Sequence, residues 1–272
     1  MKVNNVFARC VGRRHTTVPL VATLTAAILL SACGDGPSSH ADFTANQQLL
    51  TTCDPAKPPA SLVEIDGTGS SASDAITAER ITAVESIATR TAVCSGHLRV
   101  LVFSASSAAT TVLFDGDLKQ LGATDNARLR RVPETVKGVM DTVRSGYRSA
   151  MASLPQGASD ITAQYRLASE WKQQLGGNSA LNLVILTDGF QNVSVDLAAK
   201  ALSADEAKVL ADRVAMPNLA GASVTVAGLG RIAKGAPPSA IVEGLVHYYN
   251  ALCAKASAAT CTSVSDYAEA GR

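Results

Sequence analysis

One short stretch of the sequence places a carboxylate and two hydroxyls on a turn. The largely apolar run 62–65 ends at Asp66, and Thr68 and Ser70 follow, separated by glycines that allow a tight bend. From residue 73 onward, apolar side chains recur every three to four residues, so the turn is expected to join a strand to a helix. Hard cations such as Mg²⁺ take carboxylate, hydroxyl and water oxygens as ligands. The spacing therefore predicts half of a metal site.

A second strand, far along the chain, supplies another carboxylate. Residues 183–186 are apolar, and Thr187, Asp188 and Gly189 follow them. The carboxyl ends of parallel strands meet at one edge of a sheet, and open α/β folds bind their ligands outside that edge. Asp188 is therefore expected to lie beside Asp66 and to complete the metal site.

Together these motifs resemble the metal-ion-dependent adhesion site of the von Willebrand factor A (VWA) domain family. That site combines a D-x-S-x-S turn, a distant threonine and a later T-D-G aspartate. Residues 66–70 read Asp-Gly-Thr-Gly-Ser and are similar to the first motif, and residues 187–189 match the third. Residues 157–160 read Gly-Ala-Ser-Asp where family members often read G-G-T-D. Thr68 and Ser159 differ from the family residues, but each keeps a hydroxyl oxygen.

The resemblance implies a divalent cation, with Mg²⁺ expected and Mn²⁺ or Ca²⁺ as the alternatives. It covers roughly residues 58–260, judged by the order of elements and the usual size of a domain. A cation held by two carboxylates keeps an open position that an acidic side chain of a partner protein can fill. We therefore expect a protein-binding module and not an enzyme. The five expected cation ligands are Asp66, Thr68, Ser70, Ser159 and Asp188.

Two other functions fit parts of the same sequence. Residues 64–68 read Glu-Ile-Asp-Gly-Thr and resemble the D-x-D-G-T nucleophile motif of haloacid dehalogenase-type phosphatases. Glu64 would take the nucleophile position, where its extra methylene displaces the attacking oxygen by about 1 Å, an error that costs roughly 10²-fold in rate. The paired acids that bind Mg²⁺ in that family are also missing, because Asp188 has no acidic neighbour. The other alternative is the same fold without a metal, acting as a structural interaction module.

Strands and helices alternate along the chain, as the crossover units of a mostly parallel sheet require. We expect a doubly wound α/β fold with one antiparallel edge strand and helices on both faces. The VWA resemblance implies the same three-layer sandwich. The residues after 261 are expected to form either a short final edge strand or a frayed end. The expected strands are 62–66, 98–103, 110–114, 183–187 and 222–229, and the expected helices are one from 73, 133–153, one from 161, 203–214 and 239–255.

The amino-terminal segment has the features of an export signal. Residues 1–32 contain four basic residues, no acid and an apolar run, 18–30, that is shorter than the about 20 residues needed to span a membrane. The run leads to Leu-Ser-Ala before Cys33, which resembles the lipobox of bacterial lipoproteins, where the cysteine is lipidated. We expect an extracytoplasmic protein attached to the bacterial cell membrane by this lipid alone, with the export route left open. Residues 33–60 are expected to be a flexible tether, and residues 61–272 the VWA-like domain.

Four cysteines remain beyond the lipidation site, an even number that suits an exported protein. They predict two disulfides, for which three connectivities are open. We favour Cys53 with Cys94, which bracket the first strand and helix, and Cys253 with Cys261, which close a short alanine-rich loop. No Cys-x-x-Cys occurs, so the sequence does not predict a zinc site.

Charge and glycine spacing exclude two classes of ligand. Without residues 1–32 the chain keeps 20 of its 24 lysines and arginines against 23 aspartates and glutamates. Its net charge is then about −3, whereas a protein that binds nucleic acid usually carries an excess of positive charge. Residues 228–233 read Gly-Leu-Gly-Arg-Ile-Ala, similar to a dinucleotide fingerprint. However, Pro237 and Pro238 interrupt the helix that must follow, and no strand ending in an acid comes next. We therefore expect neither nucleic acid nor nucleotide as a partner.

Overall fold

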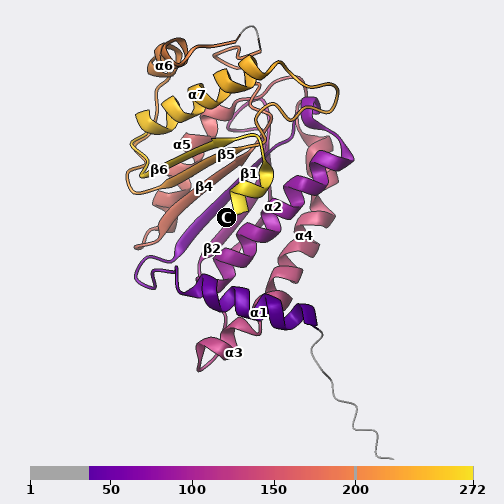
Figure 1. The fold of residues 1–272 in the computed structure, drawn as a ribbon, viewed down its shortest axis with the longest axis vertical. Helices are drawn as coiled ribbons and strands as arrows, with labels where there is room; N and C mark the ends of the chain where they lie inside the picture. Colours follow the sequence, from indigo (N-terminus) through magenta and orange to yellow (C-terminus); the bar gives the residue numbers. More distant parts are fainter. Residues whose placement is uncertain (1–36, 199–200, 272) are drawn as a thin grey trace, which may run out of the picture. The chain divides into compact units, whose positions relative to one another are not determined.

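Six strands form one sheet in the computed structural model, which describes residues 37–198 and 201–271 (Figure 1). Their order is β3-β2-β1-β4-β5-β6, and every neighbouring pair is parallel except β2 and β3. The predicted doubly wound sheet with one antiparallel edge strand is therefore confirmed. The strands are β1 (Pro59–Asp66), β2 (His97–Phe103), β3 (Thr110–Asp117), β4 (Ala180–Leu186), β5 (Ser223–Ala227) and β6 (Thr260–Val264).

The central strand β1 is buried on both faces of the sheet. Its side chains alternate between two cores, with Val63 and Ile65 in one and Ala60 and Leu62 in the other. Parallel pairing with β2 and β4 sets Ile65 opposite Leu186, so the carboxyl ends of the three strands lie along one edge. The candidate site is built on this edge.

Helices cover both faces of the sheet, with α2 and α4 on one side and α5 and α7 on the other (Figure 1). The helix predicted over 203–214 is observed as α6, and a capping box starts it, because Ser203 and Glu206 bond each other's amides. The helices are α1 (Pro37–Leu50), α2 (Asp74–Val93), α3 (Asp125–Leu129), α4 (Val132–Ser153), α5 (Ile161–Leu175), α6 (Ala204–Asp212) and α7 (Ser239–Lys255), with 3₁₀ helices η1 (Gly69–Ser71) and η2 (Tyr267–Gly271).

The flexible tether expected over residues 33–60 is wrong where the structure describes that segment. Residues 37–50 form helix α1, and β1 already begins at Pro59. Phe43, Leu49 and Leu50 pack against the core under α2 and α4. These apolar side chains are too few to give a helical period, so the sequence pattern alone does not reveal the helix.

The chain after α7 forms an edge strand, which settles the alternative between a strand and a frayed end. β6 runs parallel to β5, with Cys261 opposite Val224. The following helix η2 packs against α2 and β5. Pairing with a buried neighbour therefore stabilises a strand whose own residues, Thr260–Val264, are mostly polar and exposed.

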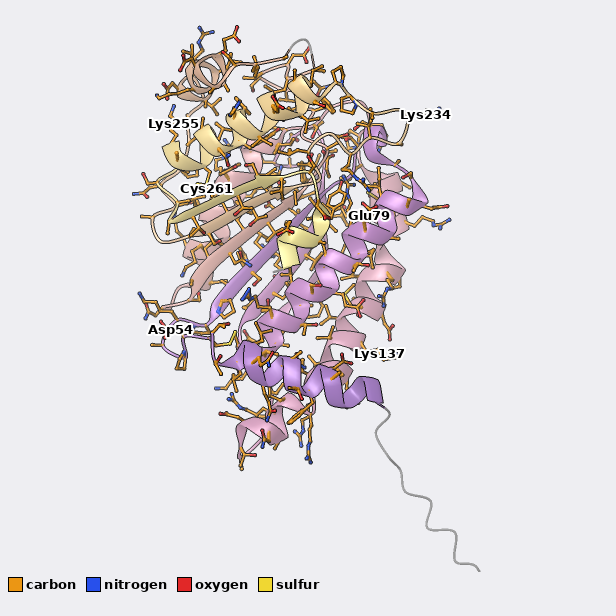
Figure 2. The ribbon with its side chains drawn as sticks, viewed as in Figure 1. Asp54, Glu79, Lys137, Lys234, Lys255 and Cys261 are labelled. Carbon is orange, nitrogen blue, oxygen red and sulfur yellow. A yellow bond between two sulfur atoms is a disulfide. The ribbon has the colours of Figure 1, made fainter. Side chains whose placement is uncertain are left out.

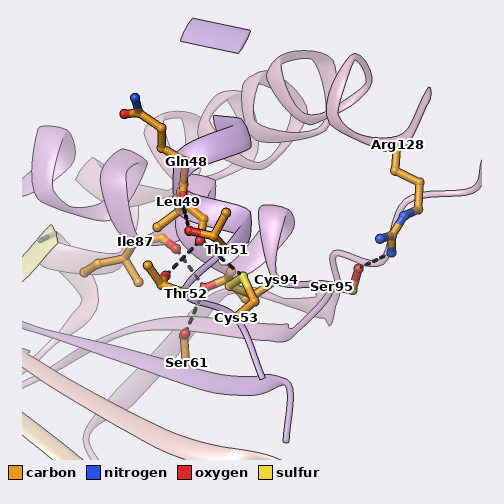
Figure 3. Close-up of a disulfide and its surroundings, with 11 residues drawn as sticks. Gln48, Leu49, Thr51, Thr52, Cys53, Ser61, Ile87, Cys94, Ser95 and Arg128 are labelled. Carbon is orange, nitrogen blue, oxygen red and sulfur yellow. Dashed lines mark hydrogen bonds between the residues drawn. A yellow bond between two sulfur atoms is a disulfide. The ribbon is translucent and has the colours of Figure 1, made fainter. Parts of the chain in front are cut away.

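Both disulfides favoured from the sequence are confirmed. Cys53, which follows α1, is bonded to Cys94 at the end of α2, with 5.4 Å between their Cα atoms (Figure 3). Cys253 of α7 is bonded to Cys261 of β6, with a Cα distance of 5.9 Å. The first bond attaches the α1 segment to the rest of the domain, and the second ties the last strand to the helix before it.

The expected signal segment, residues 1–32, and the expected lipidation residue Cys33 lie outside the described residues. Among the helices that the structure does describe, none is long and apolar enough to cross a membrane. Anchoring through a lipid therefore stays a prediction.

Candidate functional site

Asp66 ends β1 and lies at the centre of the predicted site. Its side chain is fully buried, and its two oxygens accept hydrogen bonds from three residues. Oδ1 accepts from the Thr68 amide at 3.0 Å and from the Thr68 hydroxyl at 2.8 Å. Oδ2 accepts from the hydroxyls of Ser159 at 3.1 Å and Thr187 at 2.7 Å. The bonds fix the carboxylate and leave lone pairs on the three hydroxyl oxygens for a further ligand.

The turn after β1 keeps its hydroxyls close to this carboxylate. Thr68 Oγ1 and Ser70 Oγ lie 3.3 Å apart, and Thr68 is buried whereas Ser70 is exposed. Gly67 permits the turn, because a Cβ there would lie 2.9 Å from side-chain atoms of both Val102 and Leu154. A larger residue at position 67 would therefore displace the hydroxyl-bearing turn.

Ser159 reaches the site from the loop between α4 and α5. Its amide donates to Asn192 Oδ1 at 2.9 Å, and Asn192 Nδ2 donates to the Gly157 carbonyl at 2.9 Å. Asp160 caps α5 by accepting from the Ala163 amide at 3.1 Å. The loop is held at both ends, so the Ser159 hydroxyl has a fixed position beside Asp66.

Asp188 follows β4 and approaches from the neighbouring strand. It is 1% exposed, and its Oδ1 accepts from the Phe190 amide at 3.0 Å. Its Oδ2 is buried and accepts no hydrogen bond from the described residues. Gly189 has φ +83°, and a Cβ there would collide with Leu229, so only glycine fits the turn that aims Asp188 at the site. A buried, unpartnered carboxylate oxygen of this kind is stabilised by a cation.

Burial and the neighbouring Asp66 carboxylate raise the pKa of Asp188 to about 6, and the nearby Ser70 hydroxyl partly offsets this shift. An aspartate in an unfolded chain has a pKa of about 3.9. The cation-free folded protein therefore binds a proton at Asp188 more tightly than the unfolded chain does. Between about pH 4 and 6, raising the pH removes stability from the cation-free protein.

We expect this pH dependence to distinguish wild-type protein from Asp188→Asn. In EDTA, raising the pH from 5 to 7 should lower the free energy of unfolding of wild-type protein, relative to the variant, by on the order of 1 kcal/mol. Added cation should stabilise the wild type more at pH 7 than at pH 5, because it requires ionised Asp188. Urea unfolding at the two pH values measures both effects. A wild-type curve parallel to that of Asp188→Asn would contradict the assignment.

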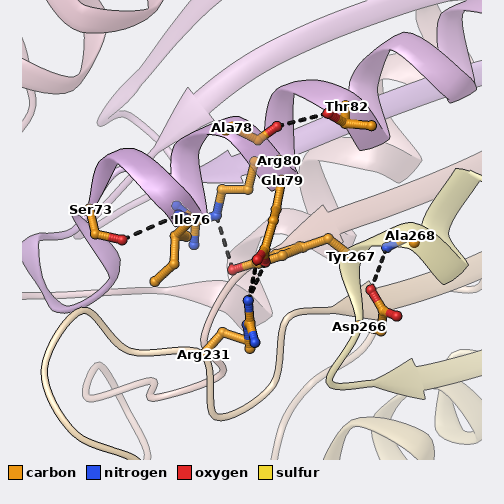
Figure 4. Close-up of polar contacts among 10 residues, drawn as sticks. All are labelled: Ser73, Ile76, Ala78, Glu79, Arg80, Thr82, Arg231, Asp266, Tyr267 and Ala268. Carbon is orange, nitrogen blue, oxygen red and sulfur yellow. Dashed lines mark hydrogen bonds and ion pairs between the residues drawn. The ribbon is translucent and has the colours of Figure 1, made fainter.

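Arg80 supports the site from beneath, and no sequence motif indicated it. The side chain is 1% exposed; its Nη1 donates to the main-chain carbonyl of Asp66 at 2.8 Å, and its Nε donates to the Tyr267 hydroxyl at 3.1 Å (Figure 4). Burial acts to lower the pKa of Arg80, but Tyr267, Tyr147 and Asp66 together raise it. The guanidinium therefore stays charged and links the end of β1 to η2.

The loop after β5 lies beside the exposed side of the site. The Gly230 amide donates to the Asp188 carbonyl at 2.8 Å, and the Ala233 amide donates to the Ser70 carbonyl at 2.9 Å. Arg231 in this loop forms an ion pair with Glu79 of α2 (Figure 4). These contacts hold the loop against both halves of the site.

The surroundings of Glu64 argue against the phosphatase alternative. It is fully buried within β1, and neither carboxylate oxygen has a hydrogen-bond partner among the described residues. Burial raises the pKa of Glu64 well above its usual value. A carboxyl that is buried and kept neutral is a poor nucleophile, so the position that resembles the phosphatase nucleophile does not form one here.

The structure brings the five predicted side chains, on Asp66, Thr68, Ser70, Ser159 and Asp188, to one sheet edge. The residues 37–198 and 201–271 contain no group of three His, Cys, Asp or Glu that could hold a metal, so hydroxyls would have to supply part of the ligand set. Sequence reasoning missed the supporting residues Thr187, Asn192 and Arg80. Only Thr187 carried a signal, as the first residue of the T-D-G motif.

Comparison with known proteins gives distant structural similarities only. No family model matches the sequence, and no curated protein matches it. Solved structures that it resembles include the ArnB paralog VWA2 from Sulfolobus acidocaldarius, at 12% identity and TM-score 0.42 over 79% of this chain and 43% of that chain. An aerotolerance-related membrane protein from Bacteroides fragilis matches at 13% identity and TM-score 0.40, over 78% of this chain and 94% of that one. The manganese-loaded TRAP protein of Plasmodium vivax matches at 13% identity and TM-score 0.34, over 71% and 63% of the two chains.

These matches concern the fold alone. The chain spans less than half the length of the first structure named above. The fold is described by the sheet itself, which has parallel strands, one antiparallel edge pair and helices on both faces.

Proposed function

We propose that this chain is a lipid-anchored, extracytoplasmic binding module that captures an acidic group of a partner protein at a divalent cation. Mg²⁺ is the expected cation, with Mn²⁺ and Ca²⁺ as alternatives. The observation that carries the proposal is the buried, unpartnered Oδ2 of Asp188 beside a carboxylate surrounded by hydroxyls. The residues that would hold the cation are Asp66, Thr68, Ser70, Ser159 and Asp188.

Hydrogen bonds within the chain orient the hydroxyl oxygens of the proposed cation site. Thr68 and Ser159 donate their hydroxyl protons to Asp66, so their oxygen lone pairs are free to face a cation. A bound cation would supply an electrophilic centre with a position open to a carboxylate. Ser70 is the exposed member of the set, so a partner would approach from the Ser70 side.

The surface on this side favours an acidic partner. Lys234 is exposed and follows Ala233, whose amide bonds Ser70 (Figure 2). Arg231 nearby is neutralised by Glu79, so Lys234 adds an exposed positive charge, unpaired among the described residues, to the loop that bonds Ser70. Complementary charges at a rim mainly accelerate association and make it sensitive to salt.

Calorimetric titration of the detergent-solubilised full-length protein with each cation tests the proposal. We expect one cation per chain. Thr68→Ser should bind as well as wild type, because the hydroxyl remains, whereas Thr68→Val should bind at least about tenfold more weakly. The absence of binding for all three cations, or equal binding by Thr68→Val, would contradict the site. Partner capture without a cation would then favour the metal-free interaction module.

The proposed anchor gives a separate prediction. Cys33→Ala should leave the protein unlipidated, so that it is released from membranes or remains unprocessed. Membrane fractionation and mass spectrometry of the amino terminus measure the outcome. Wild-type protein that washes off membranes with salt and carries no lipid would contradict the anchor and would not affect the cation site.

A further inference from the structure

A groove adjoins the candidate cation site and has no role in the capture described above. It encloses about 890 Å³ between the first turns of α5 and the segment that follows α6. This volume is typical of ligand pockets, about 300–1,000 Å³. Asp160 lines the groove, and it directly follows Ser159, one of the proposed cation ligands. Because neighbouring Cα atoms are about 3.8 Å apart, an extended chain bound at the cation would enter the groove within a few residues.

The walls of the groove are mainly apolar, and one of the two arginines that line them has no side-chain partner among the described residues. Asp160 is occupied in capping α5, and Asp196 accepts from the Ala198 amide. Arg166 contacts Glu170 and Ser107 on the surface. Arg213, by contrast, has no ion pair or side-chain hydrogen bond within the described part of the chain. The apolar lining consists of Val195, Leu202, Leu210, Val214, Met216 and Pro217.

We propose that this groove binds the stretch of the partner next to the captured acid. The recognised segment then contains a glutamate or aspartate for the cation, a leucine-like side chain for the apolar walls and a second acid that pairs with Arg213. The inference rests on the proposed capture function and adds the sequence class of the partner. The cation supplies attachment, and the groove supplies discrimination among acidic segments.

The mixture of apolar and charged side chains in the lining favours a protein segment over a wholly apolar ligand or a nucleic acid. A wholly apolar ligand would cover Arg213 without giving it a partner, which costs free energy. A nucleic acid requires a run of basic side chains, and here two aspartates line the groove together with two arginines. A protein segment that carries both apolar and acidic side chains satisfies the walls and the arginine together.

The test uses fluorescent synthetic peptides and detergent-solubilised full-length protein in MgCl₂. The short probe carries one glutamate in a glycine–serine background, and the extended probes add two leucines and an aspartate at increasing distances from the glutamate. The groove variants are Val214→Asn and Arg213→Glu. Their matched controls are Val209→Asn, an exposed valine of α6 outside the groove, and Arg148→Glu, an exposed arginine of α4.

We expect the best extended probe to bind wild-type protein about tenfold more tightly than the short probe, because it buries apolar side chains. Val214→Asn and Arg213→Glu should each remove most of that gain and leave short-probe binding unchanged, and the controls should alter neither. Photo-leucine in the extended probe should crosslink to Val214 or Met216, as mapped by mass spectrometry.

Three results would overturn the inference while leaving cation-dependent capture intact. They are equal binding of both probes, a gain that survives both groove variants, and crosslinks outside the groove, including crosslinks between two copies of the chain. If neither probe binds in MgCl₂, or if EDTA does not alter binding, the capture function itself fails and the inference fails with it.

Discussion

Asp66→Ala is expected to abolish cation binding. Asp66 provides one of the two carboxylates that the described residues bring to the site, and it also orients the hydroxyls of Thr68, Ser159 and Thr187. Its removal therefore takes away one negative charge and releases three oxygens from their fixed positions. Calorimetric titration should give no measurable heat with Mg²⁺, Mn²⁺ or Ca²⁺.

A second variant separates loss of charge from loss of structure. Asp66→Ala leaves buried hydroxyls without an acceptor, which also destabilises the fold. Asp66→Asn keeps the side-chain volume and one acceptor oxygen, so it should remain folded while its cation affinity falls at least about 100-fold. Asp141→Ala on the surface of α4 is the matched control and should behave like wild type. A folded Asp66→Asn protein that binds cation as tightly as wild type would refute the assignment.

Much of the fold could be predicted because its signals are local. The apolar run 183–186 forms most of β4, the last helix spans residues 239–255 as expected, and the capping box starts α6. Helix α1 and strand β6 were harder, because their stability comes from contacts with distant parts of the chain. α1 depends on packing against α2 and on the Cys53–Cys94 bond, and β6 depends on pairing with β5.

The same distinction applies to the site. Asp66, Thr68 and Ser70 lie within one turn, so their spacing alone shows that they can share a ligand. Ser159 comes from another loop, and its position depends on Asn192, which no sequence motif marks. Thr187 was visible as part of a motif, but its bond to the Asp66 carboxylate depends on the register between β1 and β4. Arg80 could not be foreseen, because an arginine in a helix is normally solvated.

Arg80→Met should destabilise the domain by about 3 kcal/mol, among the largest effects of any substitution outside the predicted ligands. The variant keeps an unbranched side chain in the buried space but removes the donors to the Asp66 carbonyl and the Tyr267 hydroxyl. Both buried acceptors would lose a charged partner, and η2 would lose its polar link to β1. Urea unfolding with the disulfides intact measures the free energy, and titration should show a weaker cation site because the end of β1 is less well fixed. Arg148→Met on the exposed face of α4 is the control and should change stability by less than about 0.5 kcal/mol. If Arg80→Met unfolds at the same urea concentration as wild type and binds cation equally well, the buried arginine has no part in holding the site together.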